Sequence, residues 1–176
     1  TNVPVGLSNV VAIAAGSFSS LALKANGFVT TWGFSFLNAP AGLSNVVAIA
    51  GGRFHSLALK NDGTVTAWGD NGSGQLNVPA GLSNVVAIAA GSFHNLALKS
   101  DGTVVAWGGN SSGQTNVPAG LTNIAAIAAG GFHSLALKPN GSVVAWGDYT
   151  AGQTSLTTGL TNVVAISAGY LHSLAL

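Results

Sequence analysis

The chain has 176 residues, of which 48% are hydrophobic and only 5% charged, with a formal net charge of +1. This charged fraction lies far below the roughly 25% usual in soluble domains, and it offers no basic surface for nucleic acid. Cysteine is absent, which excludes disulfides, thiolate nucleophiles and cysteine-based zinc sites. Polar residues and glycine interrupt every apolar run before the roughly 20 residues that a membrane helix needs, so we expect no membrane insertion.

One phrase recurs along the whole chain, with glycines that mark its copies at intervals of 36, 39, 39 and 39 residues: Gly16, Gly52, Gly91, Gly130 and Gly169. A fixed period of this size is typical of propellers and solenoids. Residues 1–9 match the tail of a preceding copy. The copies that follow are residues 10–45, 46–84, 85–123 and 124–162, and residues 163–176 begin a fifth. We therefore treat residues 1–176 as a single repeat domain or a fragment of one.

Each copy is predicted to form four short strands, which the copy at 85–123 illustrates. Val85 to Ala90 is apolar throughout, as expected of a strand that is buried on both faces. His94 to Lys99 alternates in polarity, and the glycine of Ser100-Asp101-Gly102 favours a hairpin turn. Thr103 to Trp107 is a third strand, and a weak fourth is expected near Asn116-Val117, where Pro118 prevents a long continuation.

Four antiparallel strands in a unit of about 40 residues are typical of a propeller blade. The fold class predicted is therefore all-β, a β-propeller of four-stranded antiparallel blades with about four and a half repeats in this chain. A parallel β-helix is the structural alternative, although its coils usually lack an internal hairpin. A helical solenoid is disfavoured because no segment has a sustained 3.6-residue period.

Two segments resemble a known family. Residues 127–137 (IAAGGFHSLAL) and 107–114 (WGGNSSGQ) are similar to the signature of the regulator of chromosome condensation repeat. This resemblance implies a β-propeller, typically of seven blades. Because the copies are short and uniform, the chain looks more like compact bacterial versions than like the eukaryotic namesake. We take the fold from the resemblance, and we do not take the namesake's nucleotide exchange activity or its chromatin docking.

Histidine and tryptophan recur at fixed repeat positions, which are His55, His94, His133 and His172, and Trp32, Trp68, Trp107 and Trp146. The first copy has Ser19 at the histidine position. We expect each histidine to bond to backbone within its own blade, because blades about 10 Å apart cannot place several imidazoles around one metal. We expect the tryptophans to pack between adjacent blades, with stacking on sugars or bases as the alternative. No metal and no cofactor is predicted.

Catalysis has little support in the sequence. The only carboxylates are Asp62, Asp70, Asp101 and Asp148, and no spacing brings two of them to one substrate atom. The loop 70–75 lacks the alternating carboxylates and terminal glutamate of a calcium loop. We therefore expect a protein that is not an enzyme.

A candidate partner-binding face follows from the order of the strands. The turn after the first strand and the loop after the third should emerge on the same side, and these two places differ most between copies. The candidate residues there are Arg53, Tyr170, Phe34, Phe36, Asp70, Asp148 and Ser92. The opposite side carries the uniform hairpin turns and is the less promising one.

The repeats in this chain do not make a seven-bladed ring, so either further blades continue the ring or chains associate through open blade edges. The function predicted is a non-enzymatic protein-interaction scaffold in an extracellular or cell-surface protein of bacterial type. A carbohydrate-binding, lectin-like propeller and a structural subunit of an extracellular assembly are the alternatives. A protein partner is expected first and a glycan second.

Overall fold

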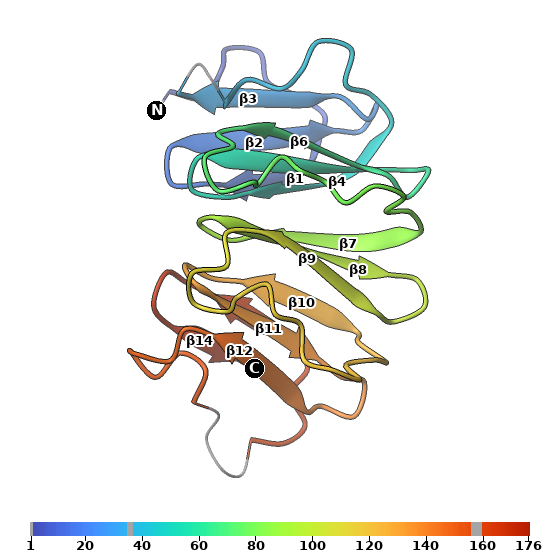
Figure 1. The fold of residues 1–176 in the computed structure, drawn as a ribbon. Coiled ribbons are helices and arrows are strands. Elements are labelled where there is room, and N and C mark those ends of the chain that lie inside the picture. The colour runs from blue at the N-terminus through green and yellow to red at the C-terminus, as the bar shows by residue number, and fades with distance from the viewer. Residues whose placement is uncertain (1, 35–36, 156–159) are drawn as a thin grey trace.

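The computed structural model describes residues 2–34, 37–155 and 160–176, and it consists of five antiparallel sheets that follow one another along the chain (Figure 1). The strands are β1 (Val10–Ala15), β2 (Ser19–Lys24), β3 (Val29–Gly33), β4 (Val46–Gly51), β5 (His55–Lys60), β6 (Val65–Gly69), β7 (Val85–Ala90), β8 (His94–Lys99), β9 (Val104–Gly108), β10 (Ala126–Ala129), β11 (His133–Leu137), β12 (Val143–Gly147), β13 (Ile166–Ala168) and β14 (Ser173–Ala175). The first four sheets each contain three strands in chain order, and the fifth contains β13 and β14.

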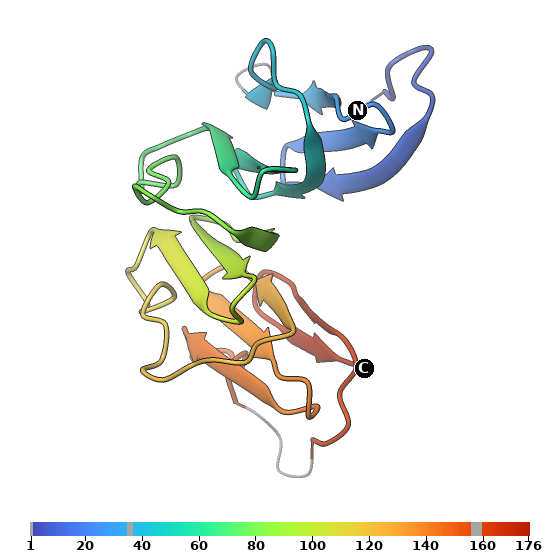
Figure 2. The same cartoon turned by 90° about the vertical axis from the view of Figure 1, so that its right-hand side faces the viewer.

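Figure 2 shows that the sheets are arranged side by side along an arc rather than in a flat stack. The first strand of each sheet contacts the first strand of the next, from β1 and β4 through to β10 and β13. The first strands therefore lie on the inside of the arc, as in part of a propeller.

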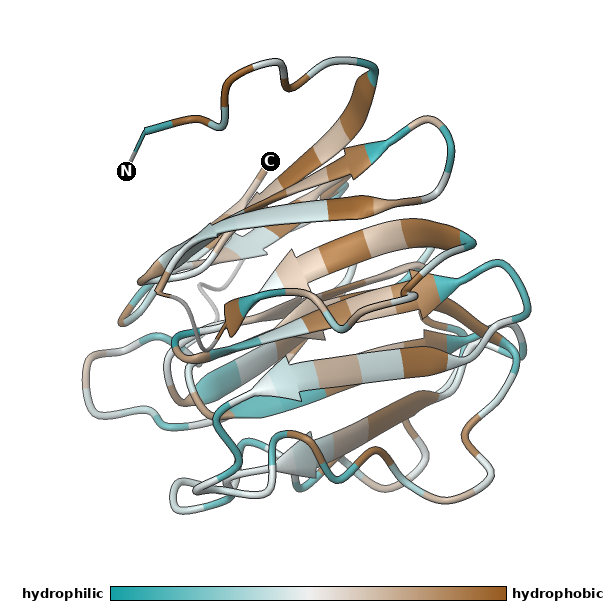
Figure 3. Ribbon diagram, turned by 90° about the horizontal axis from the view of Figure 1, so that it is seen from above, coloured by the Kyte–Doolittle hydropathy of each residue, from teal (hydrophilic) through white to brown (hydrophobic). Residues whose placement is uncertain are grey.

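The second strands of the three inner sheets, β5, β8 and β11, are the most buried elements, because a neighbouring sheet covers each of their faces. In β8, every residue from His94 to Leu98 is buried. Three apolar clusters fill the spaces between successive sheets, and each contains a tryptophan from the later sheet: Trp68, Trp107 or Trp146. Figure 3 shows that hydrophobic residues, in brown, recur along the strands, whereas the hydrophilic residues, in teal, lie mainly in the turns.

The expected fourth strand is wrong for the residues that the structure describes. The backbone N–H groups that such a strand would need are used within the loop instead. The N–H of Leu76 donates to Asn71 Oδ1, that of Asn77 to the Gly74 carbonyl, and that of Val78 to the Leu76 carbonyl. Pro79 follows and has no N–H to donate. Residues 76–78 therefore form hydrogen bonds within the loop after β6 and do not add a fourth strand to the sheet.

The asparagine before each first strand has a left-handed backbone, with φ between 56° and 59° at Asn9, Asn45, Asn84, Asn123 and Asn162. Asparagine tolerates this conformation better than most residues do. The turn lets the chain leave one sheet and enter the next. The repeated Leu-Ser/Thr-Asn that precedes each first strand therefore has a backbone explanation.

Candidate partner-binding surface

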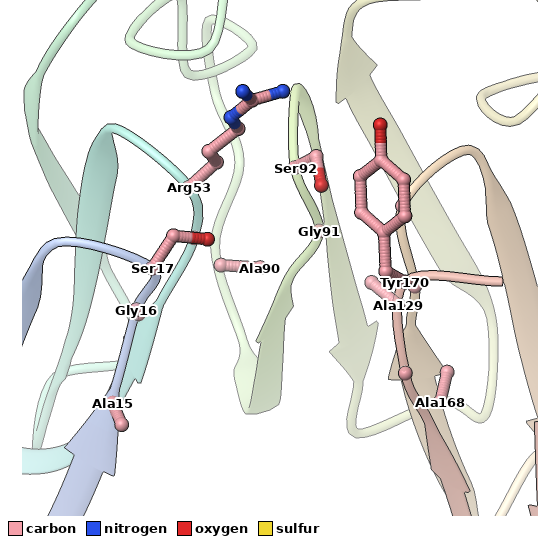
Figure 4. Close-up of a pocket in the computed structure, with 15 residues that line it drawn as sticks. Ala15, Gly16, Ser17, Arg53, Ala90, Gly91, Ser92, Ala129, Ala168 and Tyr170 are labelled. Carbon is pink, nitrogen blue, oxygen red and sulfur yellow. The ribbon is translucent and has the colours of Figure 1, made fainter. Parts of the chain in front are cut away.

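The turns after the first strands and the loops after the third strands lie side by side on one edge of the arc. A backbone hydrogen bond joins them in each of the first four sheets: the N–H groups of Phe34, Asp70, Gly109 and Asp148 donate to the carbonyls of Phe18, Phe54, Phe93 and Phe132. Near the centre of this edge, the turns surround a hollow of about 280 Å³. Figure 4 shows Arg53 and Tyr170 extending from its rim in the same direction, above the small residues Ala90 and Ala129.

Two groups of aromatic rings, linked by Arg53, cross this edge from the first sheet to the fifth, and we call them together the aromatic row: Phe34, Phe18 and Phe54, then Phe93, Phe132 and Tyr170. Centroid distances between successive rings are 5.3 Å for Phe34 and Phe18 and 4.8 Å for Phe18 and Phe54. In the other half of the row, the centroid distance is 5.4 Å between Phe93 and Phe132 and 5.9 Å between Phe132 and Tyr170.

Arg53 bridges the two halves of the row. Its guanidinium carbon lies 5.1 Å from the Phe54 ring centroid and 5.6 Å from the Phe93 centroid, within the range of cation–π attraction. The four lysines lie at the opposite ends of the strands, where Lys24, Lys60 and Lys99 end β2, β5 and β8 and Lys138 follows β11. The aromatic row therefore holds the only full positive charge from lysine or arginine on its edge of the chain.

The structure separates the candidate residues into two groups. Arg53, Phe34 and Tyr170 belong to the aromatic row, and Phe34 and Tyr170 are each 51% exposed. Ser92 is buried beneath this surface, so its side chain is a poor anchor for a partner. Phe36 lies outside the described residues.

Asp70 and Asp148 hold their own loops in place. Asp70 Oδ2 accepts bonds from the Gly72 N–H at 3.2 Å and from Gln75 Nε2 at 2.9 Å. Asp148 accepts from both the N–H and the hydroxyl of Thr150, and from Gln153 Nε2 at 2.8 Å. The backbone N–H of Thr150 is the first cause of a lowered pKa for Asp148. Both carboxylates are thus already engaged as hydrogen-bond acceptors.

Four members of the row were not among the sequence-based candidates: Phe18, Phe54, Phe93 and Phe132. They recur at one repeat position, whereas the candidates were chosen where the copies differ. The available signal was their place, because each directly follows the variable turn residue and emerges on the same edge.

Three of the four repeated histidines, His55, His94 and His133, are buried and bond across sheets rather than to backbone within their own sheet, which corrects their expected partners; His172 is exposed. His55 Nε2 lies 2.7 Å from Asn95 Oδ1, and His94 Nε2 lies 3.0 Å from Ser134 Oγ. The partner side chain in turn donates to a loop carbonyl of the histidine's own sheet, as Asn95 does to Gln75 O. His133 and Ser173 repeat this arrangement in the next pair of sheets.

These bonds fix the tautomer of the imidazoles. Asn95 Oδ1 can only accept, so His55 Nε2 carries the proton and Nδ1 carries the lone pair. Burial, followed by the charges of His55 and His133, lowers the pKa of His94 to about 3. Burial is likewise the main cause of the lowered pKa of His55 and of His133. His55, His94 and His133 are therefore neutral at pH 7 and connect neighbouring sheets through hydrogen bonds.

Each buried tryptophan also connects two sheets. The indole N–H of Trp107 donates to Gln75 O at 3.0 Å, and that of Trp146 donates to Gln114 O at 2.9 Å. Trp68 bonds to Leu37 O in the same way. Trp32, in the first sheet, is only half-buried and lines a recess with Phe18 and Phe34. Within the described residues, no group of three or more His, Asp or Glu side chains is placed to hold a metal, and no helix is long and apolar enough to cross a membrane.

Solved structures resemble this fold. Prp20p from Saccharomyces cerevisiae, studied with its binding to Gsp1p and histones, is 23% identical with a TM-score of 0.80, and the match covers 94% of this chain and 55% of that one. The receptor kinase CR4 ectodomain from Physcomitrella patens is 30% identical with a TM-score of 0.70, covering 91% and 45%. The CRINKLY WD40 ectodomain of Arabidopsis thaliana ACR4 is 20% identical with a TM-score of 0.75, covering 98% and 62%. The chain thus spans about half the length of these three solved structures.

No curated protein sequence matches the chain. A family model does match three of its repeats, at residues 46–75, 85–114 and 124–153, which together make up just over half of the chain. The sheets that these residues form match parts of solved propellers that contain this repeat. The chain therefore belongs to the regulator of chromosome condensation (RCC1) repeat family.

Proposed function

We propose that this chain is a non-enzymatic protein-interaction scaffold, and that the aromatic row is its partner-binding surface. The observation that supports this most is the line of rings from Phe34 to Tyr170, in which Arg53 bridges Phe54 and Phe93. Aromatic residues and arginine are enriched in the energetically dominant parts of protein interfaces. The rest of the described surface contains no comparable run of ring contacts.

The row is also preorganised for binding. Each ring contacts at least one other ring of the row, and Arg53 lies against both Phe54 and Phe93. Side chains that are already ordered lose less conformational entropy when a partner docks. The rigid sheets beneath fix the spacing of the rings across all five turns, which favours recognition of a defined surface.

The hydrogen bonds of the four aspartates support a binding function rather than acid–base catalysis. Asp62 and Asp101 accept hydrogen bonds from Thr64 and Thr103 within their own hairpins, on the edge opposite the aromatic row. Asp70 and Asp148 are bonded within their loops. Each therefore has a structural task that accounts for its presence.

An extracellular or cell-surface location is part of the proposal. The similarity to the ectodomain of a receptor kinase, at 30% identity, supports such a location. The low charge, together with a polar surface built from Ser, Thr and Asn, is consistent with it.

Site-specific cross-linking tests the partner surface. A photoreactive phenylalanine analogue replaces Tyr170 in one variant and Phe28 in another, since Phe28 is similarly exposed at 50% but lies at the β2–β3 turn on the opposite edge. We expect one protein to be captured at position 170 and not at 28, and it is then purified for binding measurements. Equal capture at both positions, or none at 170, contradicts the proposed surface.

Carbohydrate binding is the second candidate, because the half-exposed rings of Phe18, Phe34 and Tyr170 present apolar faces that a sugar can cover. A glycan array separates the two. Saturable binding to a defined glycan that Tyr170→Ala abolishes favours the second candidate, and a blank array leaves the protein partner as the proposal.

A further inference from the structure

Three of the loops that follow third strands, at residues 70–75, 109–114 and 148–153, have the same glutamine, but only two of them begin with an aspartate. In each loop a buried glutamine accepts a backbone N–H through Oε1: Gln75 from Ser73, Gln114 from Ser112 and Gln153 from Ala151. This bond fixes the orientation of the amide, so that Nε2 turns the same way in all three loops.

The partner of Nε2 differs between the loops. Gln75 Nε2 donates to Asp70 Oδ2 at 2.9 Å, and Gln153 Nε2 donates to Asp148 Oδ2 at 2.8 Å. The third loop has Gly109 at the aspartate position, and Gln114 Nε2 has no hydrogen-bond partner although Gln114 is completely buried. A buried donor without an acceptor is rare in folded proteins and needs an explanation.

A recess lies where the missing aspartate would be. It measures about 510 Å³, and its lining includes Phe93, Gly109, Asn110, Gln114, Phe132 and Ser73. A Cβ atom added to Gly109 would lie 3.1 Å from Phe93 Cβ, 3.2 Å from the Phe93 carbonyl oxygen and 3.4 Å from Ser73 Cβ. A side chain there would therefore border the recess, which Phe93 and Ser73 line, once these neighbours shift by a few tenths of an ångström. The recess opens beside the aromatic row, because Phe93 and Phe132 belong to both.

The surroundings favour a negatively charged group. Arg53 lies over the Phe93 ring, with its guanidinium carbon 5.6 Å from the centroid. The aspartates of the neighbouring loops are bonded to their own glutamines and do not line this recess. A carboxylate is also the group that the same glutamine position binds in both other loops.

We propose that this recess binds a carboxylate of the partner protein, which takes the place of the aspartate that Gly109 lacks. Its oxygen accepts the Gln114 Nε2–H, and the stem of the acidic side chain, or of a C-terminal residue, packs against Phe93 and Phe132. This site rests on the proposed function, since it lies at the edge of the partner surface, but it can be tested without the partner.

The test uses acetate as the probe and the side-chain amide resonances of the glutamines as the readout, with potassium chloride at the same ionic strength as the control. In the wild type, we expect acetate to shift the Gln114 amide saturably and to leave Gln75 and Gln153 unchanged. In Gly109→Asp, which supplies the carboxylate from the chain itself, the shift should be lost. In Asp70→Gly, which recreates the same gap in a second loop, Gln75 should gain an acetate response.

A Gln114 amide that responds equally to acetate and chloride overturns the proposal, and so does an undiminished acetate shift in a folded Gly109→Asp variant. If Gly109→Asp fails to fold, a folded Asp70→Gly variant whose Gln75 amide ignores acetate also overturns it. The acetate results and the cross-linking results can be told apart. Capture at position 170 without an acetate effect overturns only the carboxylate site. An acetate response at Gln114 without capture at position 170 contradicts only the proposed function.

Discussion

His55 Nε2 donates a hydrogen bond of 2.7 Å to Oδ1 of Asn95, a residue that lies forty positions later in the chain and in the next sheet. Asn95 then donates to the Gln75 carbonyl, which also accepts the indole N–H of Trp107. His55, Asn95 and Trp107 are therefore joined in one hydrogen-bonded junction through the Gln75 carbonyl. The same junction recurs between the third and fourth sheets, with His94, Ser134 and Trp146.

The first pair of sheets lacks this junction, because Ser19 occupies the histidine position. The hydroxyls of Ser19 and Ser56 are both buried and have no hydrogen-bond partner. We predict that Ser19→His stabilises the protein by about 1 kcal/mol, since the imidazole would donate to Ser56 Oγ as His94 does to Ser134. Urea unfolding measures the change, and Ser19→Gln is the control. An unchanged or lower free energy of unfolding in Ser19→His contradicts the prediction.

The glycine at the end of each first strand makes room for the histidine ring. A Cβ atom on Gly91 would lie 2.6 Å from His94 Nδ1 and 2.5 Å from the Gly130 carbonyl oxygen. We predict that Gly91→Ala destabilises the protein by about 3 kcal/mol or more, because neither the ring nor the neighbouring backbone can move aside easily. Gly72→Ala is the matched control, since its Cβ would meet no atom closer than 3.4 Å. Similar melting temperatures for the two variants would refute this packing role.

Stability should fall in mild acid. Burial lowers the pKa of His94 to about 3, whereas the unfolded chain has a value near 6.5. Below pH 6.5 the unfolded state therefore binds more protons, and the free energy of unfolding decreases until the pH reaches the folded-state value. Above pH 6.5 this contribution is fully present. His55 and His133 have lowered pKa values and act in the same direction.

Denaturant unfolding between pH 7.5 and 4.5 measures this effect. The window lies above 3.8, the ordinary value for the aspartates, whose pKa is lowered further at Asp62, Asp101 and Asp148, so these carboxylates contribute little there. His94→Asn should lose part of the slope. If the free energy of unfolding does not change between pH 7.5 and 4.5, the lowered pKa values of the buried histidines are contradicted.

The strand pattern could largely be predicted from the sequence. The strands expected at residues 85–90 and 94–99 are β7 and β8 with the same bounds, because alternation, apolar runs and the Asp-Gly turn are local signals. The fourth strand could not, since the side chain of Asn71 competes for the N–H of Leu76. That competition depends on the loop's three-dimensional shape.

The site was harder to predict, because its contacts join residues that are distant in the chain. Asn95, Ser134 and Ser173 each follow a residue at the histidine position, but each bonds to the histidine forty positions earlier, so nothing local marks it as a partner. Arg53 and Tyr170 occupy a turn position that varies between copies, whereas the phenylalanines recur unchanged at the next position of the first four copies. Only the arrangement of the sheets shows that Phe54, Phe93 and Arg53 make one surface.

The central claim is that partners bind at the aromatic row. The most direct measurement is the dissociation constant of the protein captured at position 170 for the wild type, Arg53→Ala, Tyr170→Ala and Phe28→Ala. The row predicts a loss of tenfold or more for Arg53→Ala and Tyr170→Ala, which corresponds to about 1.4 kcal/mol each, and no change for Phe28→Ala. Unchanged affinity in the two row variants, or an equal loss in Phe28→Ala, would contradict the claim.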